Sequence, residues 1–198
     1  MSAGYRNPAI ILGTVLMLEH SQARRRGSVP VAGFTLVELM ITLAVAAVVM
    51  AIAVPNFTGL VNTSRLTSQA NDLITGIQLA RSEAIRLNRR VTFCGGAAVT
   101  DTTCTAGAGN WANWLVLRAD DGAVLHSGQV SPTVQVSAAD GALAFRPDGM
   151  ARTADGLLAN TSIRLCMPVT RPQENIRRVN VAAGSRTSTA GENGNGEC

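Results

Sequence analysis

An unbroken apolar segment near the N-terminus constrains this chain more than any other feature. Residues 34–54 read FTLVELMITLAVAAVVMAIAV, and Glu38 is the one charged residue among these 21. A helix of this length, at about 1.5 Å per residue, spans the roughly 30 Å hydrocarbon core of a bilayer. Arg24, Arg25 and Arg26 precede the segment, and basic flanks of this kind stay in the cytoplasm. We therefore expect a single-pass helix whose C-terminal side is exported.

Two features of the segment have alternative interpretations. A carboxylate at the centre of a bilayer costs about 2.5–3.5 kcal/mol, so Glu38 is by default a functional residue. Because it lies near the start of the segment, it can instead sit among the lipid headgroups and favour the helix dipole. Ala51 and Ala53, at the far end, imitate the small-residue cleavage site of an ordinary secretory signal.

The string GFTLVELMITLAVAAVVMAIAVPNF resembles the class III signal of type IV pilins and type II secretion pseudopilins. The residues that carry the resemblance are Gly33, Phe34, Thr35, Leu36, Glu38 and Pro55. The resemblance implies that a prepilin peptidase cuts between Gly33 and Phe34 and methylates the new amino group of Phe34. It also implies that Glu38 pairs with the amine of a neighbouring subunit's Phe34 during assembly, which would neutralise a carboxylate in lipid.

Removal of a leader of residues 1–33 changes the electrostatic argument. All 17 basic residues are arginines, and the leader contains four of them and one acid, so its loss lowers the net charge from +4 to +1. Most of the basic excess is then a topology signal, and a bulk attraction to nucleic acid is excluded. The 4% aromatic content also argues against a base-stacking platform. A leader of this length is long for the family, so the true start is open between Met1 and Met17.

Beyond Pro55, apolar residues continue to recur at helical spacing. They are Leu60, Leu66, Leu73, Ile74, Ile77, Ala80, Ala84, Ile85 and Leu87. We expect one helix from about Phe34 to Asn88, kinked at Pro55 because proline removes a backbone hydrogen bond. Residues 34–54 would form its transmembrane or filament-core part, and residues 55–90 an amphipathic continuation packed on the following domain.

The sequence pattern of residues 91–198 is typical of a β-rich domain. Short β-type runs alternate with turn signals, at residues 91–93, 114–117, 123–125, 133–136, 143–145, 163–166 and 176–181. The DDG at 120–122 is a hairpin signal and the PDG at 147–149 a turn signal. Residues 187–198 are rich in Gly, Ser, Thr and Asn, and we expect them to be irregular. The predicted fold is α+β, with a long helix packed on an antiparallel two-sheet domain.

This domain resembles the GspH/FimT/FimU group of minor pilins and pseudopilins. The stretches ARSEAIRLNRRVTFC at 80–94, NWLVL at 113–117 and FRPDGMA at 145–151 carry the resemblance. It implies a pilin-like protein of the inner membrane with a periplasmic C-terminal domain. The implied partners are other pilins or pseudopilins, the prepilin peptidase and the inner membrane.

Four cysteines lie in the domain, and export permits disulfides there. Three connectivities are open, of which we favour the two local pairs, Cys94–Cys104 and Cys166–Cys198. The cysteines have neither the C-x-x-C spacing nor the nearby histidines of a metal site, so no metal is expected.

The sequence predicts no enzyme and no cofactor. The string GAGNWA at 107–112 fits a dinucleotide-binding pattern, but a loop is favoured because it does not lie between a strand and a helix. His126 is favoured as a surface or turn residue, and Asp120 and Asp121 as turn residues rather than a catalytic pair.

Four functions remain to be compared. The first is a minor pilin that helps to start assembly at or near the tip of a type IV pilus. The second is the H-type minor pseudopilin of a type II secretion system, which shares every motif named above. The third is a DNA-binding minor pilin for natural transformation, and the fourth a simple membrane-anchored periplasmic domain.

The DNA-binding function is disfavoured by the C-terminal arginines. Members with that function carry Gly-Arg-x-Arg near the C-terminus, whereas the comparable residues here are Gly184-Ser185-Arg186-Thr187. Arg177 and Arg178 are adjacent in a predicted strand and would point to opposite faces. With Arg186 they would support weak DNA association at most.

Overall fold

One long helix followed by nine strands makes up the part of the chain described by the computed structural model, namely residues 33–105, 109–153, 155–182 and 184–198. Helix α1 spans Leu36–Leu87. The strands are β1 (Val91–Gly96), β2 (Asn113–Arg118), β3 (Val124–Gln129), β4 (Gln135–Ala138), β5 (Ala142–Phe145), β6 (Ala151–Arg152), β7 (Thr161–Cys166), β8 (Ile176–Ala182) and β9 (Arg186–Glu192). The expected α+β class is confirmed. The helix runs on through Pro55, and the kink expected there stays a prediction.

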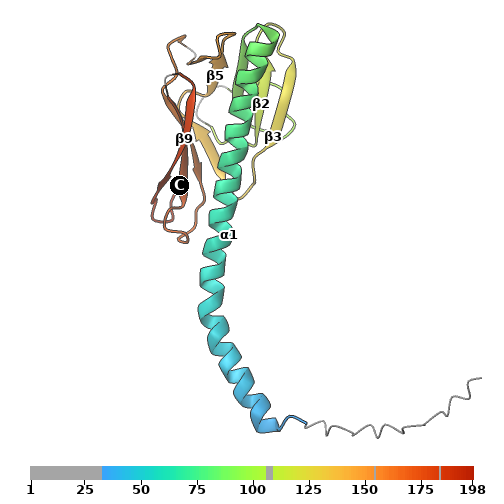
Figure 1. The fold of residues 1–198 in the computed structure, drawn as a ribbon, viewed down its shortest axis with the longest axis vertical. Coiled ribbons are helices and arrows are strands. Elements are labelled where there is room, and N and C mark those ends of the chain that lie inside the picture. The colour runs from blue at the N-terminus through green and yellow to red at the C-terminus, as the bar shows by residue number, and fades with distance from the viewer. Residues whose placement is uncertain (1–32, 106–108, 154, 183) are drawn as a thin grey trace, which may run out of the picture. The chain divides into compact units, whose positions relative to one another are not determined.

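The strands form two antiparallel sheets. The first has the order β3-β2-β1-β5-β6 and the second the order β4-β7-β8-β9. Figure 1 shows the green, C-terminal half of α1 running alongside the strands. The two turn signals are confirmed, since residues 120–122 join β2 to β3 and residues 147–149 join β5 to β6.

A single face of α1 supplies the helical side of the core. Its buried apolar side chains are Leu66, Ala70, Leu73, Ile77, Ala80 and Ala84, each at most 2% exposed. Their spacing alternates between four and three residues, which keeps them on one stripe. Phe93 and Phe145 of the five-stranded sheet and Ile163 of the four-stranded sheet belong to the same apolar cluster. The helix and both sheets therefore share one core.

Two members of the predicted helical stripe are exposed instead of buried. Leu60 lies more than a turn before Leu66, where packing against the sheets begins, and it is 66% exposed. Ile85 follows Ala84 directly, so it is rotated by about 100° from the buried stripe, and it is 52% exposed. The expectation of a buried residue is therefore wrong for both, although the Ile85 side chain still lies beside Gly149 in the β5–β6 turn.

The C-terminal segment contains a strand that sequence reasoning did not expect. Residues 187–192 belong to β9, which pairs along its whole length with β8, from Ile176↔Glu192 to Ala182↔Arg186. The turn before it contains Gly184 and Ser185, both with positive φ. Strand β9 lies at the edge of its sheet and is largely exposed, so it needs no apolar alternation. The expectation of an irregular tail is therefore wrong for residues 187–192.

Candidate functional site

The start of α1 carries the residues expected to act in processing and assembly. Gly33 and Phe34 precede the helix, and Thr35 is its N-cap residue. The Thr35 hydroxyl accepts a hydrogen bond from the backbone N–H of Glu38 (3.2 Å), and the Thr35 carbonyl accepts one from Leu39 N–H (3.1 Å). Glu38 thus occupies the third helical position, where a carboxylate favours the positive end of the helix dipole. Residues 1–32, including Arg24 to Arg26 and both candidate start residues, lie outside the described part.

The first half of α1 exposes a large apolar surface. Phe34 is 78% exposed, and Leu36, Met40, Val48 and Ile52 are each more than 60% exposed. Isolated apolar residues on a surface are ordinary, but a continuous patch of this kind marks a binding or membrane surface. The helix is also long and apolar enough to cross a membrane by length and composition. This segment is therefore suited to a membrane or to packing against other apolar helices.

Both disulfides expected from the sequence are present. Cys94 at β1 is bonded to Cys104, and Cys166 at the end of β7 is bonded to Cys198. The first closes a loop with a sequence separation of 10, and the second one of 32. Because a longer loop loses more entropy in the unfolded chain, the second disulfide is expected to contribute more, about 3–4 kcal/mol against about 2.5–3 kcal/mol.

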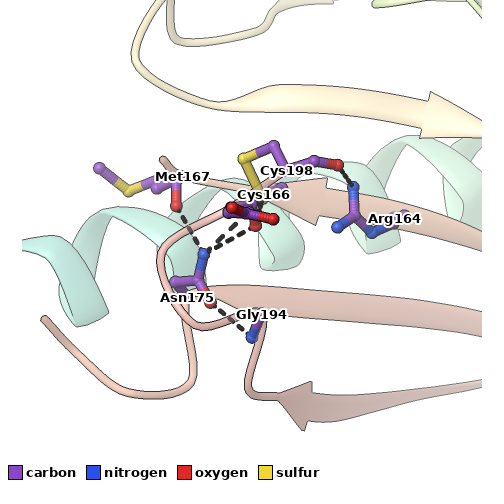
Figure 2. The surroundings of a disulfide bond; sticks show 7 residues. Arg164, Cys166, Met167, Asn175, Gly194 and Cys198 are labelled. Carbon is purple, nitrogen blue, oxygen red and sulfur yellow. Dashed lines mark hydrogen bonds between the residues drawn. A yellow bond between two sulfur atoms is a disulfide. The ribbon is translucent and has the colours of Figure 1, made fainter. Parts of the chain in front are cut away.

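A buried asparagine holds the same tail as the second disulfide (Figure 2). Asn175 is fully buried, and its Nδ2 atom donates to the carbonyls of Met167 (2.9 Å) and Glu197 (3.1 Å). Its Oδ1 atom accepts from the backbone N–H of Gly194 (2.7 Å). Arg164 Nη1 adds a bond to the carbonyl of Cys198 (2.8 Å). The tail is therefore fastened by side-chain hydrogen bonds as well as by sulfur.

The residues weighed as catalytic candidates have structural contacts. Asp121 and Asp120 form ion pairs with Arg118, and Asp120 also pairs with Arg89. The Arg118 hydrogen bond is the chief reason why the pKa of Asp121 is lowered to about 2. These contacts lie at the turn of the β2–β3 hairpin. This agrees with the expectation that Asp120 and Asp121 are turn residues.

His126 also contacts a carboxylate, but on the helix. Its Nε2 atom lies 3.3 Å from Oε1 of Glu83, and Arg86 Nη2 lies 2.6 Å from Oε2 of the same residue. The hydrogen bond from Arg86 is the main cause of the lowered pKa of Glu83. His126 is half-exposed on β3, close to the expected surface position. The string at 107–112 begins outside the described residues.

The C-terminal arginines do not converge into one basic surface. Arg177 pairs with Glu174 (3.0 Å), and Arg178 pairs with Glu192 (2.5 Å). The two arginines are adjacent in β8 and so point to opposite faces of the sheet. Arg186 begins β9 and is exposed. Two of the three candidate phosphate ligands are therefore already neutralised by acids of this chain.

Sequence reasoning missed the helix-capping role of Thr35, which it named only as part of the N-terminal motif, and it missed Asn175 entirely. The role of Thr35 could have been found, because Thr-x-x-Glu before an apolar run is the pattern of a helix capping box. Asn175 gives no local signal, because its partners Gly194 and Glu197 are about 20 residues away along the chain.

Family models and solved structures are similar to parts of this chain. The family model for the prokaryotic N-terminal methylation motif matches residues 30–54. No curated protein sequence gives a significant match. Similar solved structures include the type IV minor pilin FimU of Pseudomonas aeruginosa, which is 18% identical, with 63% of this chain and 92% of that chain covered and a TM-score of 0.47.

Another similar structure is the minor pseudopilin EpsH from the type 2 secretion system of Vibrio cholerae. It is 13% identical, with 64% of this chain and 97% of that chain covered and a TM-score of 0.45. The family model for type II transport protein GspH matches residues 69–185, which is more than half of the chain. The chain therefore belongs to the GspH family.

Proposed function

We propose that this protein is a minor pilin of a type IV pilus, anchored in the inner membrane and then assembled at or near the pilus tip to help start assembly. The observation that carries the proposal is the joining of an N-terminal methylation motif and an uncovered apolar half-helix to a folded GspH domain. Such a helix is stable in a bilayer and also in a bundle of similar helices, because both cover its apolar side chains. A subunit that moves between a membrane and a filament core needs this property.

Processing of the proposed pilin starts at the N-terminal motif. A prepilin peptidase cuts between Gly33 and Phe34, removes the leader of residues 1–33 and methylates Phe34. The helix then has a cationic amine one residue before its N-cap, Thr35. Residues 34–54 form the transmembrane and later filament-core segment, residues 55–90 continue the helix, and residues 91–198 form the periplasmic domain.

Glu38 guides the new subunit into the filament in this proposal. Its carboxylate lies in the first turn of an apolar helix, where it is costly in lipid unless a cation neutralises it. The amine of Phe34 on a neighbouring subunit is such a cation. The proposed partners are therefore other pilins of the same filament, with the prepilin peptidase and the inner membrane acting earlier.

A second function is favoured by the name of the family itself. The matching model is described as a type II transport protein, so the H-type minor pseudopilin of a type II secretion system is the alternative. Both functions use the same N-terminal chemistry. They differ in the machine that the filament serves, and this difference gives the test.

The decisive experiment deletes the gene and complements it with the wild-type chain. If the pilus proposal is right, the deletion lowers the number of surface pili, leaves protein secretion unchanged, and is rescued by complementation. Immunogold labelling of a tagged chain should then mark filament ends. Loss of protein secretion with normal piliation would replace the proposal with the pseudopilin alternative. The intact mass of the membrane-purified chain tests processing, since the mature protein should begin at a methylated Phe34.

A further inference from the structure

A pocket of about 260 Å³ lies on the five-stranded sheet, on the face turned away from the core. Side chains alternate between the two faces of a strand, and Phe93, Leu143 and Phe145 point into the core. Thr92, which directly precedes Phe93, and Ala144, which lies between Leu143 and Phe145, therefore point to the opposite face. Both line the pocket, and because these side chains are small they leave a hollow in the sheet surface.

Thr92 and Ala144 form the floor of the pocket, and three arginines surround it. Arg90, Arg146 and Arg152 all line the pocket. The strand register explains their meeting. Val91 pairs with Phe145, so Arg90 and Arg146 are opposite each other just beyond that pair, while Arg152 is paired directly with Ala144. Like charges at facing positions destabilise a sheet. The arrangement therefore costs folding energy unless an anion compensates it.

The described part of the chain supplies no such anion. Several other arginines are paired with acids, as in Arg89–Asp120, Arg118–Asp121, Arg177–Glu174 and Arg178–Glu192, whereas Arg65 and Arg186 stand singly at exposed positions in the described structure. Among the described residues, the three arginines of the pocket form no ion pair, although Asp155 lies in the loop beside Arg152.

The hydrogen-bond donors of Arg152 are also incompletely used. Its Nη1 atom donates to the carbonyl of Gly156 (3.0 Å), whereas its Nε atom is buried without a partner in the structure. A buried donor that lacks an acceptor is costly. An acceptor placed in the pocket would satisfy it.

We propose that this arginine pocket, formed by Arg90, Arg146 and Arg152 over Thr92 and Ala144, is a binding site for a single anionic group, a carboxylate or a phosphate. The guanidinium fork matches both groups, because each offers two acceptor oxygens at a suitable separation. The volume lies just below the 300–1,000 Å³ of ordinary small-molecule pockets, so the site accepts one group rather than an extended ligand. The site is remote in sequence from the N-terminal segment and goes beyond the proposed function.

Binding is tested on the full chain purified in detergent, by calorimetric titration with two probes. Inorganic phosphate represents a free or esterified phosphate, and N-acetylglutamate represents the acidic side chain of a neighbouring subunit. Sodium chloride at equal ionic strength corrects for general screening. At least one probe should bind with a stoichiometry of about one per chain, because each chain has one arginine pocket. The stronger probe identifies the source of the anion.

Matched variants locate the bound anion. Arg90→Gln and Arg146→Gln should each weaken binding by about tenfold or more, which is the loss of one charge-assisted hydrogen bond. Arg186→Gln removes the same charge from the edge strand of the other sheet and should leave binding unchanged. Equal binding by all three variants, or no binding of either probe to the wild-type chain, overturns the proposal.

A variant that fills the pocket tests the proposal independently of arginine loss. Thr92→Glu places a carboxylate on the floor, beneath the three guanidinium groups. We expect a higher melting temperature, because the new carboxylate relieves the like-charge repulsion, together with loss of phosphate and N-acetylglutamate binding. A Thr92→Glu chain that is less stable than the wild type and still binds a probe contradicts the assignment.

Discussion

Trp114 on β2 donates its indole N–H to Oδ2 of Asp72 on α1, at a distance of 2.9 Å. The indole is 4% exposed, so this donor depends on the carboxylate. One turn further along the helix, Gly76 lies so close to the same ring that a Cβ atom there would be 3.0 Å from it. The hydrogen bond between Asp72 and Trp114 therefore fixes the helix on the five-stranded sheet at a point where Gly76 leaves room for the indole ring.

Replacing Asp72 should destabilise the domain through its indole partner. Asp72→Ala leaves a buried N–H without an acceptor, which we expect to lower the free energy of unfolding by about 1–3 kcal/mol. Asp72→Asn keeps an acceptor and should cost less. Urea unfolding, followed by far-UV circular dichroism on the detergent-solubilised chain, measures both. In a Trp114→Phe background the cost of Asp72→Ala should largely vanish, and an unchanged cost would show that the hydrogen bond is not responsible.

Two kinds of interaction hold the C-terminal tail, the Cys166–Cys198 disulfide and the hydrogen bonds of Asn175, and their contributions to stability can be compared. Cys198→Ser should lower the free energy of unfolding by about 3–4 kcal/mol at most, the loop-closure value for this disulfide. Asn175→Ala should cost about 3 kcal/mol, because two carbonyls and one N–H lose a buried partner. The double variant should cost less than the sum, since both changes release the same tail. Strict additivity of the two values would mean that the tail is held at two independent places.

Glu38 and Thr35 allow charge and helix capping to be separated. The Thr35 hydroxyl accepts from the backbone of residue 38, so Glu38→Gln keeps this cap and removes only the charge. We expect Glu38→Gln to be processed and inserted but poorly incorporated into sheared filaments. Thr35→Ala should weaken the helix start by about 0.5–2 kcal/mol and still be incorporated. Normal incorporation of Glu38→Gln would leave Glu38 as an interfacial helix residue.

How far the sequence predicts the fold depends on where each signal lies. The apolar alternation around Val91 and the aspartate–glycine turn before Val124 are local, and both elements were predicted. Strand β9 was not, because Thr187 to Glu192 are polar and become a strand through pairing with β8. An exposed edge strand has no buried face and so lacks the alternation that marks other strands.

The functional residues also divide into those with a local sequence signal and those that depend on contacts between distant segments. The N-terminal motif is a contiguous string, so its residues could be named from the sequence. Asn175 and the arginine pocket depend on register and on contacts between distant segments. Arg90 and Arg152 are 62 positions apart and meet only because β5 lies between β1 and β6. Such juxtapositions follow from the sheet order and cannot be seen in composition or periodicity.

The β2–β3 hairpin should respond to acid. The pKa of Asp121 is lowered to about 2, first by its hydrogen bond to Arg118 and next by the backbone N–H of Ala123. A carboxylate with a depressed folded-state pKa stabilises the folded state above its ordinary value near 3.8, and this contribution is lost as the pH falls toward 2. Thermal unfolding between pH 6 and pH 2 should therefore show a shallower acid decline for Asp121→Asn than for wild type. Parallel curves would assign the acid sensitivity to other groups.

DNA binding through the C-terminal arginines is expected to be weak. Arg177 and Arg178 are each paired with a glutamate, so binding to phosphates would first require these pairs to break. With only Arg186 unpaired among the three in the described structure, few phosphates are neutralised and few counterions are released, so the affinity is weak even at low salt. Fluorescence anisotropy of a labelled duplex with the full chain in detergent should show association at low salt and almost none near 150 mM, where screening extends over about 8 Å. Arg177→Gln and Arg186→Gln should change this little. Tight binding at that salt, abolished by either variant, would favour a DNA-uptake pilin instead.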